Sequence, residues 1–247
     1  MKRTFLTLVS ALAMLTTASA QTDLRILNHL AIGAEVGTMG WGVDASVPIT
    51  RFVDVQAGFT MFPRVTFRTS LSPNLPVASI GKVPVRGKAL MKGGKVLVNV
   101  TPFPLLTSFH VTAGAYIGPA DIMGLYNPEA MPAEIAAYNA INPEQRLGLA
   151  LGDYLLEPDA NGNIDGKLKG FTAKPYVGIG IGRGVPKRRI GFKFDIGCIF
   201  WGKPTVWNNG EEVPDTDAGG DDGGIMKVVT KLKVYPVLNF RVCGRIF

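Results

Sequence analysis

Residues 174–184 read KPYVGIGIGRG, and glycine takes every second position from 178 to 184. Val177, Ile179 and Ile181 alternate with these glycines. A phosphate-binding dinucleotide loop also spaces glycines closely, but its glycines lie in a turn that leaves a strand and opens a helix, and an acidic residue follows about 20 positions later. Neither feature is present here. A spacing of two is that of a β-strand, whose two faces then differ in character.

The same alternation recurs along the chain, with apolar side chains on one face and polar side chains or glycine on the other. In residues 190–200, for example, Phe192, Phe194 and Ile196 share one face, while Lys193 and Asp195 share the other. We count eight such segments, which cover 30–36, 41–47, 53–67, a stretch ending at 100, 109–117, the opening stretch, 190–200 and about 235 to the chain end.

The connections between these segments are of two kinds that alternate. Short turns lie near residues 48–52, 102–108 and 185–189, whereas about 16, 50 and 25 residues follow the third, fifth and seventh segments. Short turns at one rim and long loops at the other are typical of outer-membrane barrels, whose antiparallel strands are even in number. We therefore predict an all-β fold, an eight-stranded antiparallel up-and-down transmembrane β-barrel with short helices in the extracellular loops and both termini in the periplasm.

A soluble barrel of the lipocalin type also alternates, but it turns its apolar face inward around a ligand. The composition of the two faces distinguishes these folds. One face is a continuous run of Val, Ile, Phe and Ala, and the other mixes charged residues with glycine. Glycine suits a narrow barrel interior, which has little room for large side chains. The apolar face is therefore expected to contact lipid and the mixed face to line the lumen.

The N-terminus has the form of a secretory signal peptide. Lys2 and Arg3 precede an apolar run that closes with the small residues Ala18, Ser19 and Ala20. We expect residues 1–20 to be the signal peptide and 21–247 the outer-membrane barrel, which places the protein in the cell outer membrane. The formal net charge of +7 does not indicate nucleic acid as a partner, because the cations are scattered rather than gathered in a basic patch.

Charged residues on the predicted lumen face are the candidate site. With four carboxylates and four cations, they either fill the interior as a mutually satisfied ion-pair network or form a constriction that passes or binds a small charged solute. The predicted lumen-lining residues are Glu35, Asp44, Asp54, Lys95, Lys174, Lys193, Asp195 and Arg241.

Three loop stretches are interpreted as structural. Residues 159–166, DANGNIDG, alternate oxygen-bearing side chains but depart from the calcium-loop pattern, so they predict a tight hairpin tip. Residues 132–156 predict one or two short helices, broken at Pro143, that cap the barrel mouth. The acidic run 211–224 predicts a solvated loop, with weak cation binding as the alternative.

No cofactor, metal site or catalytic chemistry is expected. His29 and His110 fall on the lumen phase near the periplasmic rim, without a serine or cysteine arrangement beside them, so structural roles are favoured over lipid-directed catalysis. Cys198 lies on the apolar phase and Cys243 on the lumen phase, and side chains on opposite faces cannot be bridged without distortion. Two free thiols are predicted.

Segments AEVGTMGWGVDASVPI, KPYVGIGIG, FDIGCIFWGKPTV and KVYPVLNFRVCGRIF resemble the small outer-membrane barrels related to CarO, the protein associated with carbapenem susceptibility. The resemblance covers most of the mature chain. It implies an eight-stranded barrel and, as proposed for some members, slow passage of small solutes such as basic amino acids. The closing Phe247 resembles the C-terminal aromatic residue read by the barrel-assembly machinery, although the apolar phase falls one residue earlier, on Ile246.

Two functions stay open on the sequence. The protein is either a narrow outer-membrane channel for small charged solutes or a non-conducting structural or surface-interaction barrel. Its expected partners are outer-membrane lipid and lipopolysaccharide, the barrel-assembly machinery at the C-terminal strand and a small solute.

Overall fold

The structure is a computed structural model that describes residues 29–71, 73–74, 82–143, 145–151, 154–214 and 233–246. The expected signal peptide, most of the acidic run 211–224 and Phe247 lie outside these ranges. Within them, no helix has both the length and the apolar character needed to cross a membrane.

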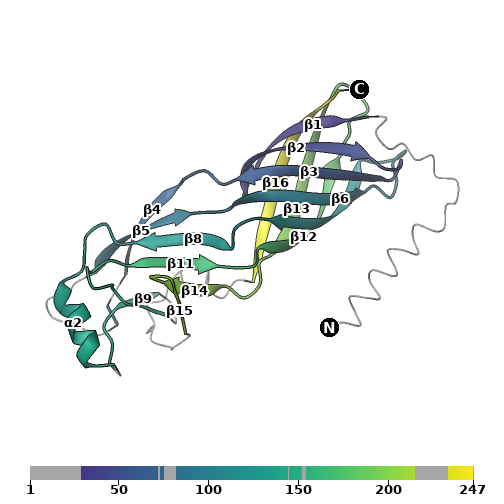
Figure 1. Cartoon of the computed structure of the whole chain (residues 1–247). Helices are drawn as coiled ribbons and strands as arrows, with labels where there is room; N and C mark the ends of the chain where they lie inside the picture. Colours follow the sequence, from purple (N-terminus) through teal and green to yellow (C-terminus); the bar gives the residue numbers. More distant parts are fainter. Residues whose placement is uncertain are drawn as a thin grey trace, which may run out of the picture.

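Eight antiparallel strands close into a barrel, as the alternation predicts (Figure 1). Their order around the barrel is β1-β16-β13-β12-β7-β6-β3-β2, and β1 closes the cylinder by pairing with β16 from Ala31↔Arg245 to Gly37↔Asn239. The barrel strands are β1 (Ala31–Gly37), β2 (Gly40–Pro48), β3 (Val53–Met61), β6 (Lys92–Val100), β7 (Phe109–Ile117), β12 (Ala173–Gly182), β13 (Ile190–Phe200) and β16 (Val234–Arg245).

Alternation along these strands sorts the side chains as the sequence predicts. Polar positions such as Glu35, Lys193 and Arg241 point inward and are buried. The apolar positions point outward and are exposed, among them Ile32, Val43, Phe59, Val98, Val111, Ile179, Ile196 and Leu238. The barrel thus has a polar interior and an apolar outer wall, which is the reverse of a soluble barrel.

The two ends of the barrel differ. At one end, here called the turn end, short turns join β2 to β3, β6 to β7 and β12 to β13, and the C-terminal strand β16 also finishes there (Figure 1). At the other end, the extension end, the long connections do not form the loops expected from the sequence. They fold into a six-stranded sheet of order β15-β14-β11-β8-β5-β4, called the extension. Its strands are β4 (Thr66–Leu71), β5 (Val83–Ala89), β8 (Asp121–Tyr126), β11 (Asp165–Lys169), β14 (Thr205–Asn208) and β15 (Glu211–Val213).

The extension continues the barrel wall. Strands β3, β6, β7, β12 and β13 are each separated by a few residues from β4, β5, β8, β11 and β14, and the strand order in the extension is that of the barrel. This corrects the predicted third segment, 53–67, which is two strands divided at residues 62–65. Pro63 explains the break, because proline cannot donate a hydrogen bond within a sheet.

A hydrophobic core of its own stabilises the extension. Val85, Leu125, Leu168 and Val206 from its strands pack in one cluster with Ile135 of α2 (Ala133–Ile141). The cluster also includes side chains of the small hairpin formed by β9 (Leu149–Leu151) and β10 (Tyr154–Leu156).

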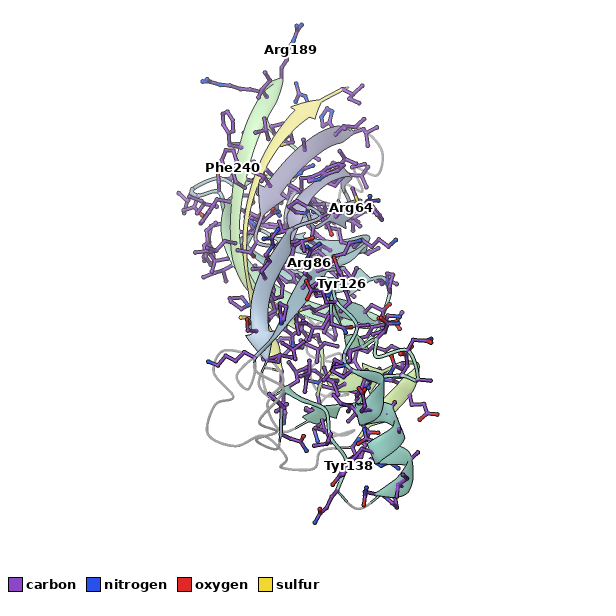
Figure 2. All side chains as sticks on the ribbon, turned by 90° about the vertical axis from the view of Figure 1, so that its left-hand side faces the viewer. Arg64, Arg86, Tyr126, Tyr138, Arg189 and Phe240 are labelled. Atoms are coloured by element: carbon purple, nitrogen blue, oxygen red, sulfur yellow. The ribbon has the colours of Figure 1, made fainter. Side chains whose placement is uncertain are left out.

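The predicted helical stretch is therefore only half helical. Its first half is α2, which ends before Pro143 as expected, and its second half is the β9–β10 hairpin. The predicted position was wrong, because α2 lies at the far tip of the extension and does not cap the barrel mouth (Figure 1). Figure 2 shows the same separation, with Tyr138 of α2 and Arg189 of the turn end at opposite ends of the molecule.

Candidate functional site: the barrel interior

Large polar side chains fill the barrel interior, and the glycines of the opening stretch make room for them. A Cβ on Gly180 would lie 2.7 Å from His110 Nε2 and 2.8 Å from Asp195 Oδ1. A Cβ on Gly178 would lie 2.5 Å from the hydroxyl oxygen of Tyr176. Glycine at the consecutive inward positions 178 and 180 of β12 is thus explained by the bulk of the neighbouring side chains inside the barrel.

One half of the interior network centres on Asp44. Its carboxylate accepts hydrogen bonds from Nε of Arg241 at 2.7 and 2.9 Å and from Nε2 of Gln56 at 2.9 Å. Nζ of Lys95 forms an ion pair with Glu35 and lies 3.5 Å from the Asp44 carboxylate. These charged side chains come from β1, β2, β6 and β16 and so tie together four separate strands across the lumen.

Arg241 is the most completely enclosed of these groups, with an exposed fraction of 0%. Besides Asp44, it donates to Oγ of Ser46 at 3.0 Å and to the backbone oxygen of Gly184 at 2.8 Å. A buried guanidinium is stable only when its donors are paired in this way.

The other half of the network centres on Lys193. Its Nζ donates to Oε1 of Gln56 at 3.1 Å and to Oδ1 of Asn99 at 3.0 Å, and it lies 3.2 Å from the Asp195 carboxylate. Asn99 in turn donates to Asp54 at 2.6 Å. Because Gln56 also donates to Asp44, the two halves form one continuous network across the barrel.

His110 also belongs to this network. Its Nε2 lies 2.7 Å from Asp195 Oδ1, and its Nδ1 faces the backbone oxygens of Gly182 at 3.2 Å and Ser108 at 3.4 Å. All three neighbouring oxygens are hydrogen-bond acceptors, so the ring is held from both of its nitrogens.

The interior network brings together all the predicted lumen residues except one. These are Glu35, Asp44, Asp54, Lys95, Lys193, Asp195 and Arg241. Lys174 lies apart, near the extension end, where its Nζ donates to the backbone oxygen of Pro119 at 3.0 Å. Sequence analysis missed Gln56 and Asn99, which link the charges, and Thr112, which donates to Asn99, although all three fall on the same inward phase.

A hydrophobic cluster of inward-facing side chains adjoins the network and continues the filling of the interior. Leu97, Tyr116, Tyr176, Ile199 and Val237 form this buried cluster, in which the two tyrosine rings meet edge to face with centroids 5.6 Å apart. Beside it is a cavity of about 20 Å³, lined in part by Tyr116 and Ile199, which is room for about one water molecule. The turn end opens into a larger cavity of about 440 Å³.

The other predicted motifs take structural roles. In the stretch 159–166, Asp159 Oδ1 accepts hydrogen bonds from the backbone of Asn161 and Asn163, which forms a tight turn. The turn is not a hairpin tip, because the strands on either side of it, β10 and β11, pair with other strands. No cluster of three or more metal-ligating side chains occurs among the residues that the structure describes.

Cys198 and Cys243 are both free, as predicted. Cys243 is buried inside the barrel, and Cys198 is partly exposed on the outer wall.

Comparison with known proteins gives matches among solved structures only, since no family model and no curated protein matches the chain. The crystal structure of Acinetobacter baumannii CarO2 is 19% identical, and the match covers 88% of this chain and 98% of that chain with a TM-score of 0.47. The crystal structure of Acinetobacter baumannii CarO is 18% identical, and the match covers 87% and 96% with a TM-score of 0.45. Both belong to the group of small barrels that the sequence resembles.

Proposed function

We propose that the protein is an outer-membrane β-barrel with a closed lumen, which anchors the extension on the cell surface. The apolar outer wall is the observation that supports this proposal. Apolar side chains cover it on every barrel strand, and in water so large an exposed apolar surface would be strongly unfavourable. Trp41 and Phe200 lie toward one end of this wall and Phe103 and Phe192 toward the other, in keeping with the aromatic girdles of such barrels.

The asymmetry of the two ends supports an orientation. Outer-membrane barrels have short periplasmic turns and long extracellular loops. The turn end then faces the periplasm and the extension projects outside the cell. In this proposal residues 1–20 direct export, and the C-terminal strand β16, which ends at Arg245, is the segment presented to the barrel-assembly machinery.

The filled lumen favours the non-conducting function over the channel. The interior network and the adjoining hydrophobic cluster both occupy the lumen, and the cavity beside the cluster holds about 20 Å³. A passing solute would have to displace paired, buried charges, which is costly. On the sequence, the charged lumen residues were the argument for a channel with a polar constriction. In this proposal they fill the barrel and join its strands.

Planar-bilayer recording tests the closed lumen. We expect purified protein, refolded in detergent and shown to be folded by its shifted mobility on an unboiled gel, to give no discrete current steps. A general porin reconstituted in the same way provides the positive control. Reproducible single-channel steps from the folded protein, absent from a boiled sample, would instead establish the narrow channel.

A basic face on the extension points to lipopolysaccharide as a partner in the outer leaflet. In a strand pair, residues directly opposite each other share a face, so Arg68 of β4 and Arg86 of β5 are neighbours. Like charges in this arrangement repel and destabilise the pair. Lys88, Lys167 and Lys169 extend the same face, where Lys167 forms an ion pair with Asp165 at 3.0 Å. The core residues point the other way. Figure 2 shows Arg86 and Tyr126 close together on this part of the molecule.

Phosphate groups of lipopolysaccharide would relieve this repulsion. Neutralising Arg68 and Arg86 together, as Arg68→Gln/Arg86→Gln, is therefore expected to weaken binding of phosphorylated lipid A roughly ten- to thirty-fold, at about 1 kcal/mol for each cation. Protein stability should be unchanged or improved. Titration with fluorescent lipid A in micelles measures the affinity.

The matched control is Arg188→Gln/Arg189→Gln, which removes the same charge from the exposed turn end. Lipid A without phosphates should bind wild type and both variants alike. An equal loss of lipid A affinity in both double variants would mean that net charge, and not this face, attracts the lipid.

A further inference from the structure

The turn end of the barrel contains a cavity that the closed-barrel function does not use. Its volume is about 440 Å³, within the range of pockets that hold small organic ligands. The turns after β2, β6 and β12 surround it, contributing Thr50, Thr101 and Pro186 among others. Asp54, at the inner end, belongs to the interior network, so that network forms the floor of the cavity.

The side chains around this cavity are predominantly cationic. Arg51, Arg183, Lys187 and Arg245 line it, whereas Asp54 is the one acidic residue among the described residues that line it. Asp54 also accepts a hydrogen bond from Asn99 on the side of the barrel interior. The electrostatic potential inside the cavity is therefore positive, and concave walls of low dielectric constant strengthen this potential.

These four cations differ from those of the interior network in having no acidic partner among the residues that the structure describes. Inside the barrel, Lys95, Lys193 and Arg241 each pair with a carboxylate. None of the cavity cations forms an ion pair within the described ranges.

Several donors of the cavity are consequently available to a ligand. Arg183 uses one nitrogen to donate to the backbone oxygen of Pro104, and the Arg51 guanidinium lies 4.7 Å from the centre of the Phe52 ring. His29 Nδ1 is buried at the cavity and has no hydrogen-bond partner among the residues described. A buried polar atom without a partner is unfavourable and is usually satisfied by a ligand or water.

We propose that this cavity binds a small organic anion carrying a carboxylate or phosphate group. Arginine presents several N–H donors in a planar fork that matches the oxygens of either group. Three arginines and a lysine around one space supply this chemistry from several sides. Thr50 and Thr101 add hydroxyl groups that suit the neutral part of such a molecule.

The site also predicts which solutes it rejects. A basic amino acid, the type of solute that the resemblance to CarO-related barrels suggests, would meet repulsion from all four cations. The proposal depends only on the geometry of the turn end, and it holds whether or not the barrel conducts or resides in the outer membrane.

Calorimetric titration of the folded protein in detergent micelles tests the site with three probes. Citrate presents carboxylates, glucose 6-phosphate presents a phosphate ester, and lysine is the cationic control. We expect saturable binding of at least one anion, weaker at high salt, and none of lysine. Binding of citrate alone would assign a carboxylate ligand, and binding of glucose 6-phosphate alone would assign a phosphate ester.

The variant Arg51→Gln/Arg245→Gln localises the binding. This double variant should weaken binding of the anion at least tenfold, because two of the four cations are lost. Arg188→Gln/Arg189→Gln removes the same charge from the same end, outside the cavity lining, and should change the affinity less than twofold. Mobility shifts on unboiled gels verify that both variants are folded.

Three results would overturn the proposal: no saturable binding of either anion, equal loss in the two double variants, or lysine binding as tightly as the anions. Failure here leaves the closed barrel intact, since current recordings and membrane placement are measured separately. Conversely, a conducting barrel would not remove the anion site.

Discussion

Replacing Phe194 with arginine should destabilise the barrel in lipid by about 2–4 kcal/mol and reduce its accumulation in the outer membrane. Phe194 lies near the middle of β13, on the outer wall, where it is opposite Ile181 and Phe240 on the neighbouring strands. If hydrocarbon contacts this wall, a guanidinium there loses its water. Chemical unfolding of protein refolded into lipid vesicles gives the free energy of unfolding.

The matched control for this substitution is Tyr138→Arg in α2. Phe194 and Tyr138 have similar exposed fractions, 39% and 36%, but Tyr138 lies at the far tip of the extension, beyond the proposed membrane. In the control the free energy of unfolding should change by less than about 0.5 kcal/mol, as for most surface substitutions. Equal effects at the two sites would show that the outer wall of the barrel is not in lipid.

The second large effect is expected at Arg241 in the interior network. Arg241→Met should cost about 3–5 kcal/mol, because it leaves the Asp44 carboxylate buried without its main partner. The same vesicle unfolding measurement applies. Arg245→Met, on the same strand but partly exposed at the turn end, should cost less than about 1 kcal/mol.

A double variant separates the loss of charge balance from the loss of packing. Asp44→Asn combined with Arg241→Met removes both members of the pair, so no unpaired charge remains between them. We expect the double variant to be more stable than Arg241→Met alone. If the effects of the two substitutions on the free energy of unfolding are instead additive, the Asp44–Arg241 contact contributes no coupling energy. The network would then not be the element that joins these strands.

Sequence alternation was sufficient to predict the barrel, because a period of two residues is a direct consequence of strand geometry. The phases of Glu35, Lys193 and Arg241 follow from it, and so does the separation of Cys198 from Cys243. Alternation does not report which charges meet. The pairing of Lys95 with Glu35, 60 positions away in the chain, depends on strand register and side-chain length.

The extension was missed for a different physical reason. Its strands β8, β11 and β14 are only four to six residues long, too short to establish a period, and one of them contains a register shift at Leu168 and Lys169. Leu149 and Leu156, which are fully buried in its core, lie in a stretch rich in helix-favouring residues. Tertiary packing overrode that local preference. The cavity at the turn end was also beyond sequence reasoning, because its cations come from separate turns.

The continuity of the barrel wall into the extension has a mechanical consequence. Loops on flexible tethers can yield when their tips are pulled, but strand pairs that run on from β3, β6, β7, β12 and β13 are held side by side by backbone hydrogen bonds. A load applied at α2 would therefore travel as tension along these ladders into the cylinder. The tip that carries α2 is thus connected to the barrel through paired strands, and its orientation follows that of the barrel.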